Sequence, residues 1–307
     1  MPENPDPTRG GPFRPTRRKV LIGAAVAAVA AAGGTTAAVA LGARGSQASG
    51  PTGKLVTPLL AADRFTVAHH GGSLDWPEES LYAYRRAVAT GVDALEMSLA
   101  RSSDGVWFGL HDRTLDRTSG TTSFVASEHT WAEIQTHRIL PAGLRDPAQA
   151  SRPYARFDDL LDEYGDTHAL FVDPKYADPS RYGELFDLIE KHVQRPIESV
   201  VAKGYCTSTA WAAAARARGH QTWGFYYANE IQAKPDLLTS TESDWTIMGL
   251  NYDGAADQWK LVNGLGKPVI GHVVPDAQAA VTSLDLGARG LMISGVEETM
   301  GKLPAKG

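Results

Sequence analysis

Short apolar runs alternate with longer amphipathic segments from about residue 65 to the end of the chain. The short runs are rich in aliphatic and aromatic residues, which is typical of strands buried on both faces. Candidate strands cover residues 65–68, 94–99, 106–110, 169–173, 199–203, 222–226, 246–250, 268–272 and 290–294. Helical periodicity predicts helices over residues 77–90, 180–192, 208–218, 255–263 and 276–286, with Gly219 and Gly287 at helix ends.

Repeated strand–helix units predict a parallel sheet. About 255 residues remain after the N-terminal segment, a length that favours a single-domain α/β fold, the (β/α)8 TIM barrel. Nine candidate strands exceed the eight that such a barrel needs. We expect 94–99 and 106–110 to form a hairpin through the turn Ser103-Asp-Gly105, which accounts for the extra strand. The polar stretch 119–155 is predicted to be an insertion over the barrel mouth.

The N-terminal 48 residues differ sharply from the rest of the chain. Arg17 and Arg18 precede an apolar run rich in Ala and Gly that ends near residue 43, which is typical of a twin-arginine (Tat) export signal. A transmembrane helix over residues 20–43 is the alternative. We therefore expect a signal segment at 1–48, a linker at 49–60 and the barrel domain at 61–307. The predicted location is extracellular or in the cell envelope, with signal cleavage or retention as an anchor left open.

Charge and cysteine content narrow the possible partners. The first 48 residues hold six basic and two acidic side chains, so the remainder carries a net charge near −9. A domain this acidic is a poor nucleic-acid binder. Cys206 is the only cysteine, so no intrachain disulfide can form. An exported protein without disulfides fits the Tat route, which carries folded proteins.

Candidate chemistry gathers where predicted strands end. His69 and His111 each follow a strand-like run, and Glu78 and Glu96 lie between them in the sequence. In a barrel these positions meet on one face. Two imidazoles that flank carboxylates supply a proton donor, a proton acceptor and a site for a hard cation. Cleavage of a phosphodiester near neutral pH needs these groups.

Four segments carry a family resemblance: His69-His-Gly-Gly72, Pro77-Glu-Glu-Ser80, Leu95-Glu-Met-Ser98, and the run from Asp104 to Thr118 that contains His-Asp-Arg-Thr-Leu-Asp-Arg-Thr. Their order and spacing resemble the glycerophosphodiester phosphodiesterase family, whose motifs read His-Arg-Gly-Gly, Pro-Glu-Asn-Thr, Ile-Glu-x-Asp and His-Asp-x-x-Leu-Asp-Arg-Thr. The resemblance is strong over residues 65–118 and weaker to about residue 298. It implies a TIM barrel that hydrolyses glycerophosphodiesters to glycerol phosphate and an alcohol with a divalent cation, Ca²⁺ or Mg²⁺.

The resemblance also implies roles for individual residues. His69 and His111 match the general acid–base pair. Glu96 and Asp173 match metal ligands, with Asp173 in a segment that reads Glu-x-Lys in the family. Ser98 stands where the family has a second metal-binding Asp. A neutral hydroxyl is a poor ligand for a hard cation, so we expect weak cation binding and uncertain activity.

Other matched positions are expected to contact substrate. Lys175 keeps the positive charge of the family's Glu-x-Lys segment, and Glu78 matches a Glu that organises the site near His69. His70 replaces a phosphate-binding Arg, and His272 replaces a Trp. An imidazole holds phosphate less well than a guanidinium, and only when it is charged.

Several assignments stay open between two interpretations. Glu79 either restores the charge lost at position 98 or is a solvated residue at a helix start. Asp112, Asp116 and Arg117 are expected to fix loop geometry. Three aromatic residues also have two interpretations. They either hold a quaternary ammonium head group or pack in the core. These residues are Trp223, Tyr226 and Tyr227.

Three functions fit these residues. The first is a secreted phosphodiesterase for a small-molecule glycerophosphodiester. The second is a sphingomyelinase D-like phospholipase acting on membrane-lipid head groups, because Asp173-Pro-Lys175 resembles the Asp-x-Lys of such enzymes. The third is a non-catalytic protein that binds phosphate esters on the same barrel. The oligomeric state is left open by the sequence.

Overall fold

The computed structural model describes residues 53–303. Within them eight parallel strands close into a barrel, because the last strand pairs with the first. The strands in barrel order are β1 (Phe65–Ala68), β2 (Ala94–Arg101), β4 (Ala169–Asp173), β5 (Val200–Tyr205), β6 (Gln221–Tyr226), β7 (Ile247–Asn251), β8 (Val269–Val274) and β9 (Gly290–Ile293). The predicted TIM barrel is confirmed. The predicted export signal at residues 1–48 lies outside the described residues.

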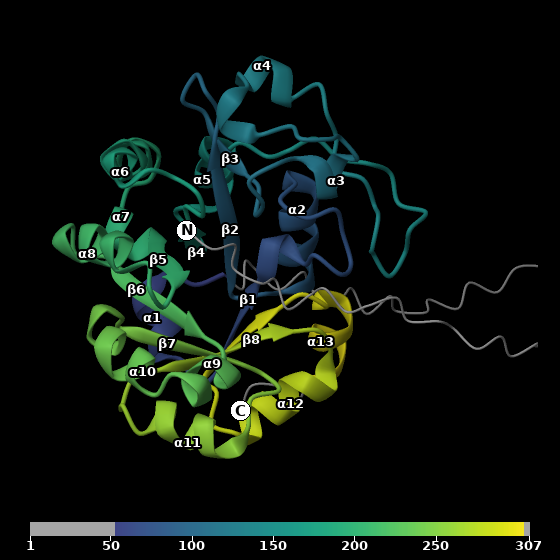
Figure 1. Ribbon diagram of the computed structural model, residues 1–307. Helices are drawn as coiled ribbons and strands as arrows, with labels where there is room; N and C mark the ends of the chain where they lie inside the picture. The colour runs from purple at the N-terminus through teal and green to yellow at the C-terminus, as the bar shows by residue number, and fades with distance from the viewer. Residues whose placement is uncertain (1–52, 304–307) are drawn as a thin grey trace, which may run out of the picture. The chain divides into compact units, whose positions relative to one another are not determined.

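Helices surround the barrel strands (Figure 1). They are α1 (Val56–Ala61), α2 (Leu81–Thr90), α3 (Asp116–Ser119), α4 (Trp131–Ile134), α5 (Phe157–Tyr164), α6 (Tyr182–His192), α7 (Pro196–Ser199), α8 (Thr209–Ala217), α9 (Ala228–Ala233), α10 (Asp236–Thr241), α11 (Ala256–Asn263), α12 (Ala277–Asp285) and α13 (Val296–Lys302). All five predicted helices are present, and Gly219 and Gly287 have the positive φ of helix-ending glycines, 86° and 98°. None of the helices within residues 53–303 is long and apolar enough to cross a membrane.

Two predicted boundaries are wrong. Helix α2 begins at Leu81 rather than at residue 77, because Glu79 has a left-handed backbone (φ 55°) and the Ser80 side chain caps the Ala83 N–H. Residues 56–61 form helix α1 instead of a loose linker. Val56 and Leu59 of α1 are buried against the side chains that fill the barrel interior.

The barrel interior changes from apolar to polar along the neighbouring strands β2, β4 and β5. Side chains two residues apart point to the same side, and here the first of each pair is apolar. On β2 Ala94 precedes Glu96, on β4 Phe171 precedes Asp173, and on β5 Val201 precedes Lys203. The apolar members pack together in one cluster. The polar members therefore meet at the end of the barrel where the strands finish.

The predicted hairpin and insertion are both present. Strand β3 (Trp107–Gly109) pairs antiparallel with the end of β2. The following segment, drawn with α3 and α4 in Figure 1, has a small core of its own. That core consists of Phe108, Leu110, Leu115, Ala126, Ile134, Ile139 and Tyr154. Arg145 of the insertion donates to the Pro275 carbonyl, which follows β8, so the insertion reaches the barrel mouth as predicted.

Candidate active site

A tight turn after β1 sets the two adjacent histidines. His69–Gly71 forms a short 3-10 helix in which His70 has φ 49°, and Gly72 follows with φ 102°. A Cβ on Gly72 would lie 2.9 Å from the Trp76 ring, so the turn needs glycine there for space as well as for backbone angle. The turn stacks the His69 and His70 rings with 3.8 Å between centroids.

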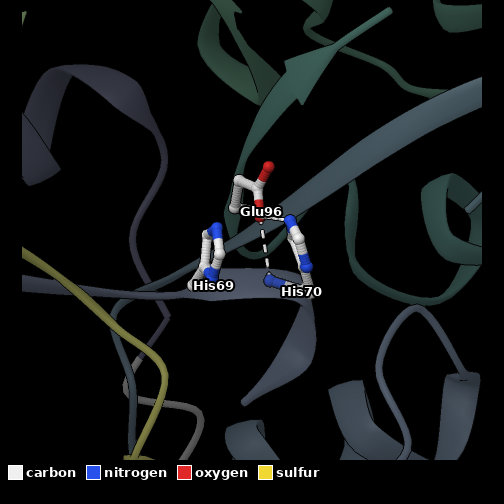
Figure 2. A group of neighbouring side chains, drawn as sticks. All are labelled: His69, His70 and Glu96. Carbon is white, nitrogen blue, oxygen red and sulfur yellow. Dashed lines mark hydrogen bonds and ion pairs between the residues drawn. The ribbon is translucent and has the colours of Figure 1, made fainter. Parts of the chain in front are cut away.

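The turn is anchored to β2 through Glu96. The His70 backbone N–H donates to Glu96 Oε2 at 2.8 Å, as Figure 2 shows. In the same view both imidazole rings rise from the turn toward the Glu96 carboxylate. His69, His70 and Glu96 offer ligand atoms within 4.8 Å of one another, and this trio could hold a metal ion. Two imidazoles and one carboxylate suit a transition metal such as zinc better than Ca²⁺ or Mg²⁺.

His111 lies close to His70. Its ring centroid is 5.2 Å from that of His70, and the His69 centroid is 3.8 Å from that of His70, so His69 and His111 lie well within the ~12 Å that a shared phosphate allows. His111 follows β3 and is partly exposed, whereas His69 and His70 are largely buried. The two histidines predicted as the acid–base pair are therefore brought together by the fold.

An ion-pair chain holds His111 in place. His111 Nδ1 bonds Asp112 Oδ1 at 2.9 Å, and Arg117 Nε donates to Asp112 Oδ2 at 2.7 Å. Arg117 also donates to both oxygens of Glu78, at 2.7 and 2.9 Å. Burial works to raise the pKa of Asp112, but the hydrogen bonds from His111 and Arg117 outweigh it and lower the pKa. An ionised Asp112 holds a proton on His111 Nδ1 and so fixes the tautomer of the ring.

The sequence did not predict this role for Asp112, although its place directly after His111 was the available signal. Asp116 matches its prediction, because it accepts from the Ser123 and Phe124 N–H groups and so fixes the loop. Glu78 lies near His70, with Oε1 3.9 Å from His70 Nδ1.

Lysine 203 lies between the two carboxylates that were predicted to bind a cation. Lys203 Nζ donates to Glu96 Oε1 at 2.9 Å and to Asp173 Oδ2 at 3.2 Å. Lys175 Nζ lies 2.7 Å from the same Asp173 oxygen. The register pairs Ser98 directly with Asp173, so all these groups come from neighbouring strands. A hard cation shared by Glu96 and Asp173 does not fit this arrangement, because an ammonium already holds both.

The electrostatics of the two lysines differ. Burial opposes the charge of Lys203, but Glu96 and Asp173 overcome it and raise the Lys203 pKa. Burial lowers the pKa of Lys175 despite Asp173. Burial, and then the charge of Lys203, lower the pKa of His69 well below its ordinary value. Burial also lowers the pKa of His70, so His70 is neutral near pH 7 and does not supply the charge of an Arg.

Glu79 is not the solvated residue that was one of its two interpretations. It is 1% exposed, and its carboxylate accepts from the Ser98 N–H while bonding the Tyr84 hydroxyl. Burial and the nearby Glu96 raise the pKa of Glu79 well above its ordinary value. Burial and Glu96 thus oppose an ionised Glu79, so Glu79 is a poor substitute for the charge lost at position 98.

His272 and the aromatic residues complete the barrel mouth. His272 Nε2 lies 3.0 Å from the Tyr226 carbonyl, and its ring packs edge-on against Phe225 and Tyr227. Burial lowers the pKa of His272 to about 3. Trp223 and Tyr226 are fully buried, which supports core packing over a head-group site.

Comparison with known proteins identifies a family that matches part of the chain. The model of the glycerophosphoryl diester phosphodiesterase family matches residues 69–218, a stretch that spans both histidines and Lys203. This match places residues 69–218 of the chain in the glycerophosphodiester phosphodiesterase family. It is 31% identical over 146 residues to glycerophosphodiester phosphodiesterase of Bacillus subtilis, a match covering 44% of this chain and 48% of that relative. It is 38% identical over 73 residues to human glycerophosphodiester phosphodiesterase 1, covering 24% and 22%. The matches thus span about half or less of these relatives.

Solved structures share the fold. Glycerophosphodiester phosphodiesterase from Agrobacterium tumefaciens superposes with a TM-score of 0.61 at 18% identity, over 78% of this chain and 99% of that one. An Oleispira antarctica phosphodiesterase in complex with the product sn-glycerol-3-phosphate gives a TM-score of 0.61 at 17% identity, over 77% and 95%. Members of this family generally use a divalent cation, whereas in this structure Lys203 contacts both carboxylates that were predicted to bind one.

Proposed function

We propose that this protein is a phosphodiesterase that hydrolyses a glycerophosphodiester to glycerol phosphate and an alcohol, with His69 and His111 as the acid–base pair. The observation that carries the proposal is the closeness of His69 and His111, whose ring centroids lie 3.8 and 5.2 Å from that of His70. The product complex of the Oleispira antarctica relative, which shares this fold, supports a glycerol phosphate product.

The contacts of the two histidines suggest which one acts as the base and which one acts as the acid. His69 Nδ1 lies 3.1 Å from Ser294 Oγ, and its lowered pKa keeps the ring neutral and able to accept a proton from the attacking hydroxyl or water. His111 has Asp112 on Nδ1, and this carboxylate stabilises the imidazolium that donates a proton to the leaving alkoxide. Lys175 supplies positive charge toward the phosphoryl oxygens. No step is assigned to a divalent cation, because the predicted Ca²⁺ or Mg²⁺ site holds Lys203.

The test is release of glycerol phosphate from glycerophosphocholine by the purified protein. We expect His69→Ala and His111→Ala each to lower turnover by at least ~10²-fold, the usual contribution of a general acid or base. His192→Ala on the surface helix α6 is the control and should leave turnover unchanged. Turnover that survives both site substitutions would refute the mechanism.

A second candidate is a protein that binds phosphate esters without cleaving them. The contacts of Lys203 favour it, because they replace the cation that the family generally uses. Binding of sn-glycerol 3-phosphate without release from any glycerophosphodiester would support this candidate. The lipid head-group alternative has less support. Among residues 53–303, Tyr176 is the one exposed large apolar side chain directly next to a residue of the site.

We also propose export by the Tat pathway, on the strength of Arg17 and Arg18 before the apolar run. Replacing both with Lys should retain the protein inside the cell in fractionation experiments. Unchanged export of the double variant would contradict this route.

A further inference from the structure

Lys203 is a buried ammonium with two carboxylate partners. Its side chain is 4% exposed, and Nζ contacts Glu96 Oε1 and Asp173 Oδ2 at 2.9 and 3.2 Å. Its Nζ also lies 5.1 Å from the centre of the Phe225 ring. These partners lie on β2, β4 and β6, so Lys203, on β5, links four strands at the centre of the site.

The neighbouring side chains leave room for this long residue. Ser98 and Asp173 are short and lie side by side in register. A calcium ion needs oxygens at about 2.3–2.6 Å, so an ion bound by both Glu96 and Asp173 would overlap Lys203 Nζ. The ammonium and such an ion cannot be bound together.

Charge leads to the same conclusion. Glu96 and Asp173 bring two negative charges, and Lys203 and Lys175 bring two positive ones. Both oxygens of Glu79 are already engaged, by Tyr84 and by the Ser98 N–H. A divalent ion added here would leave excess positive charge in a buried site, which is costly.

We propose that Lys203 takes the place of a divalent cation between Glu96 and Asp173, so that this site binds its phosphate ester without Ca²⁺ or Mg²⁺. Lys203 holds the two carboxylates together and, with Lys175, makes the site attractive to the phosphoryl group. The identity of the ester rests on the proposed function, whereas the replacement of the cation does not.

The first experiment measures cation binding directly. Wild-type protein is titrated with Ca²⁺, Mg²⁺ and Mn²⁺ by calorimetry up to about 5 mM, above the ~10⁻⁴–10⁻³ M range of weak protein calcium sites. We expect no binding and no shift in melting temperature relative to EDTA. Saturable binding that is lost in Glu96→Gln would overturn the proposal.

The second experiment removes the ammonium. Lys203→Ala leaves Glu96 without its ammonium partner and Asp173 with Lys175 alone, so we expect a lower melting temperature that Ca²⁺ raises by at least about 3 °C through binding. Lys175→Ala is the matched control, since it removes a lysine from Asp173 but leaves Lys203 in place, and it should gain no Ca²⁺ response. A folded Lys203→Ala protein without that response would refute the idea that the ammonium excludes the ion. If this variant does not fold, the wild-type titration alone decides.

The third experiment separates this inference from the proposed function. Affinity for sn-glycerol 3-phosphate is measured with EDTA and with Ca²⁺ or Mg²⁺. Equal affinity within about twofold supports binding without metal, and a tenfold gain with cation overturns it. No binding under either condition contradicts the proposed substrate, while the cation titration still decides the role of Lys203.

Discussion

Acid should destabilise this protein through His272, and the structure sets the size of the effect. The side chain is buried among Trp223, Phe225 and Tyr227, and its Nε2 is bonded to the Tyr226 carbonyl. Its pKa is lowered to about 3, whereas an unfolded histidine titrates near ~6.5. The folded state therefore excludes a proton that the unfolded state binds.

The sign and magnitude follow from proton linkage. Because the folded pKa is the lower one, the stability is fully present above pH ~6.5 and is lost as the pH falls toward 3. Each pH unit in this window costs about 1.4 kcal/mol, so His272 should destabilise the fold by about 3 kcal/mol at pH ~4.5. No discount for solvent screening applies, since His272 is 2% exposed.

The assay compares wild type with His272→Gln by urea unfolding across this range. At pH ~7.5 the variant should be less stable by about 1–3 kcal/mol, because it loses packing. At pH ~4.5 that deficit should shrink by about 3 kcal/mol or reverse, since other titrating groups cancel in the difference. His192→Gln on helix α6 is the control, because it removes an imidazole from outside the barrel interior. A deficit that stays constant within about 0.5 kcal/mol would refute the buried, neutral His272.

Three further substitutions test other parts of the structure. Asp112→Asn should lower turnover about 10²-fold or more with little change in KM, because His111 loses its orienting carboxylate; Asp116→Asn, which touches only the loop, is the control in the same steady-state assay. Glu79→Gln should become more stable relative to wild type as the pH rises above ~4.5. In wild type the free energy of unfolding falls by about 1.4 kcal/mol per pH unit in this range, until the pH reaches the raised pKa of Glu79 in the folded state. Equal pH dependence of the two proteins in urea unfolding would contradict this. Ser80→Ala should cost about 1 kcal/mol in calorimetry by removing the helix cap.

The barrel could be predicted from the sequence because each of its strands has a local sequence pattern. A buried parallel strand is a short apolar run, and the helix that follows has its own period, so both are visible without tertiary contacts. The start of α2 was missed because a left-handed Glu79 looks like any helix-starting Glu in the sequence. The buried tertiary environment of Glu79, rather than its local propensity, sets this conformation.

The site was predicted in its members but not in its contacts. His69, His111, Glu96 and Asp173 were found because they sit in motifs or at strand ends. Lys203 is the last residue of the predicted strand 199–203, yet its partnership with Glu96 spans 107 positions and depends on strand register. The alternation of Val201 and Lys203 on one strand was the signal that pointed the lysine into the barrel.

The two histidines proposed as the acid–base pair belong to different parts of the described structure. His69 follows the first barrel strand, whereas His111 lies in the segment with its own small core around Phe108 and Leu115. Such a lobe can open locally at a lower free energy than global unfolding. Opening would carry His111 away from His69 while the barrel stays intact, so heat or denaturant should inactivate the protein before the barrel amides lose their protection from hydrogen exchange.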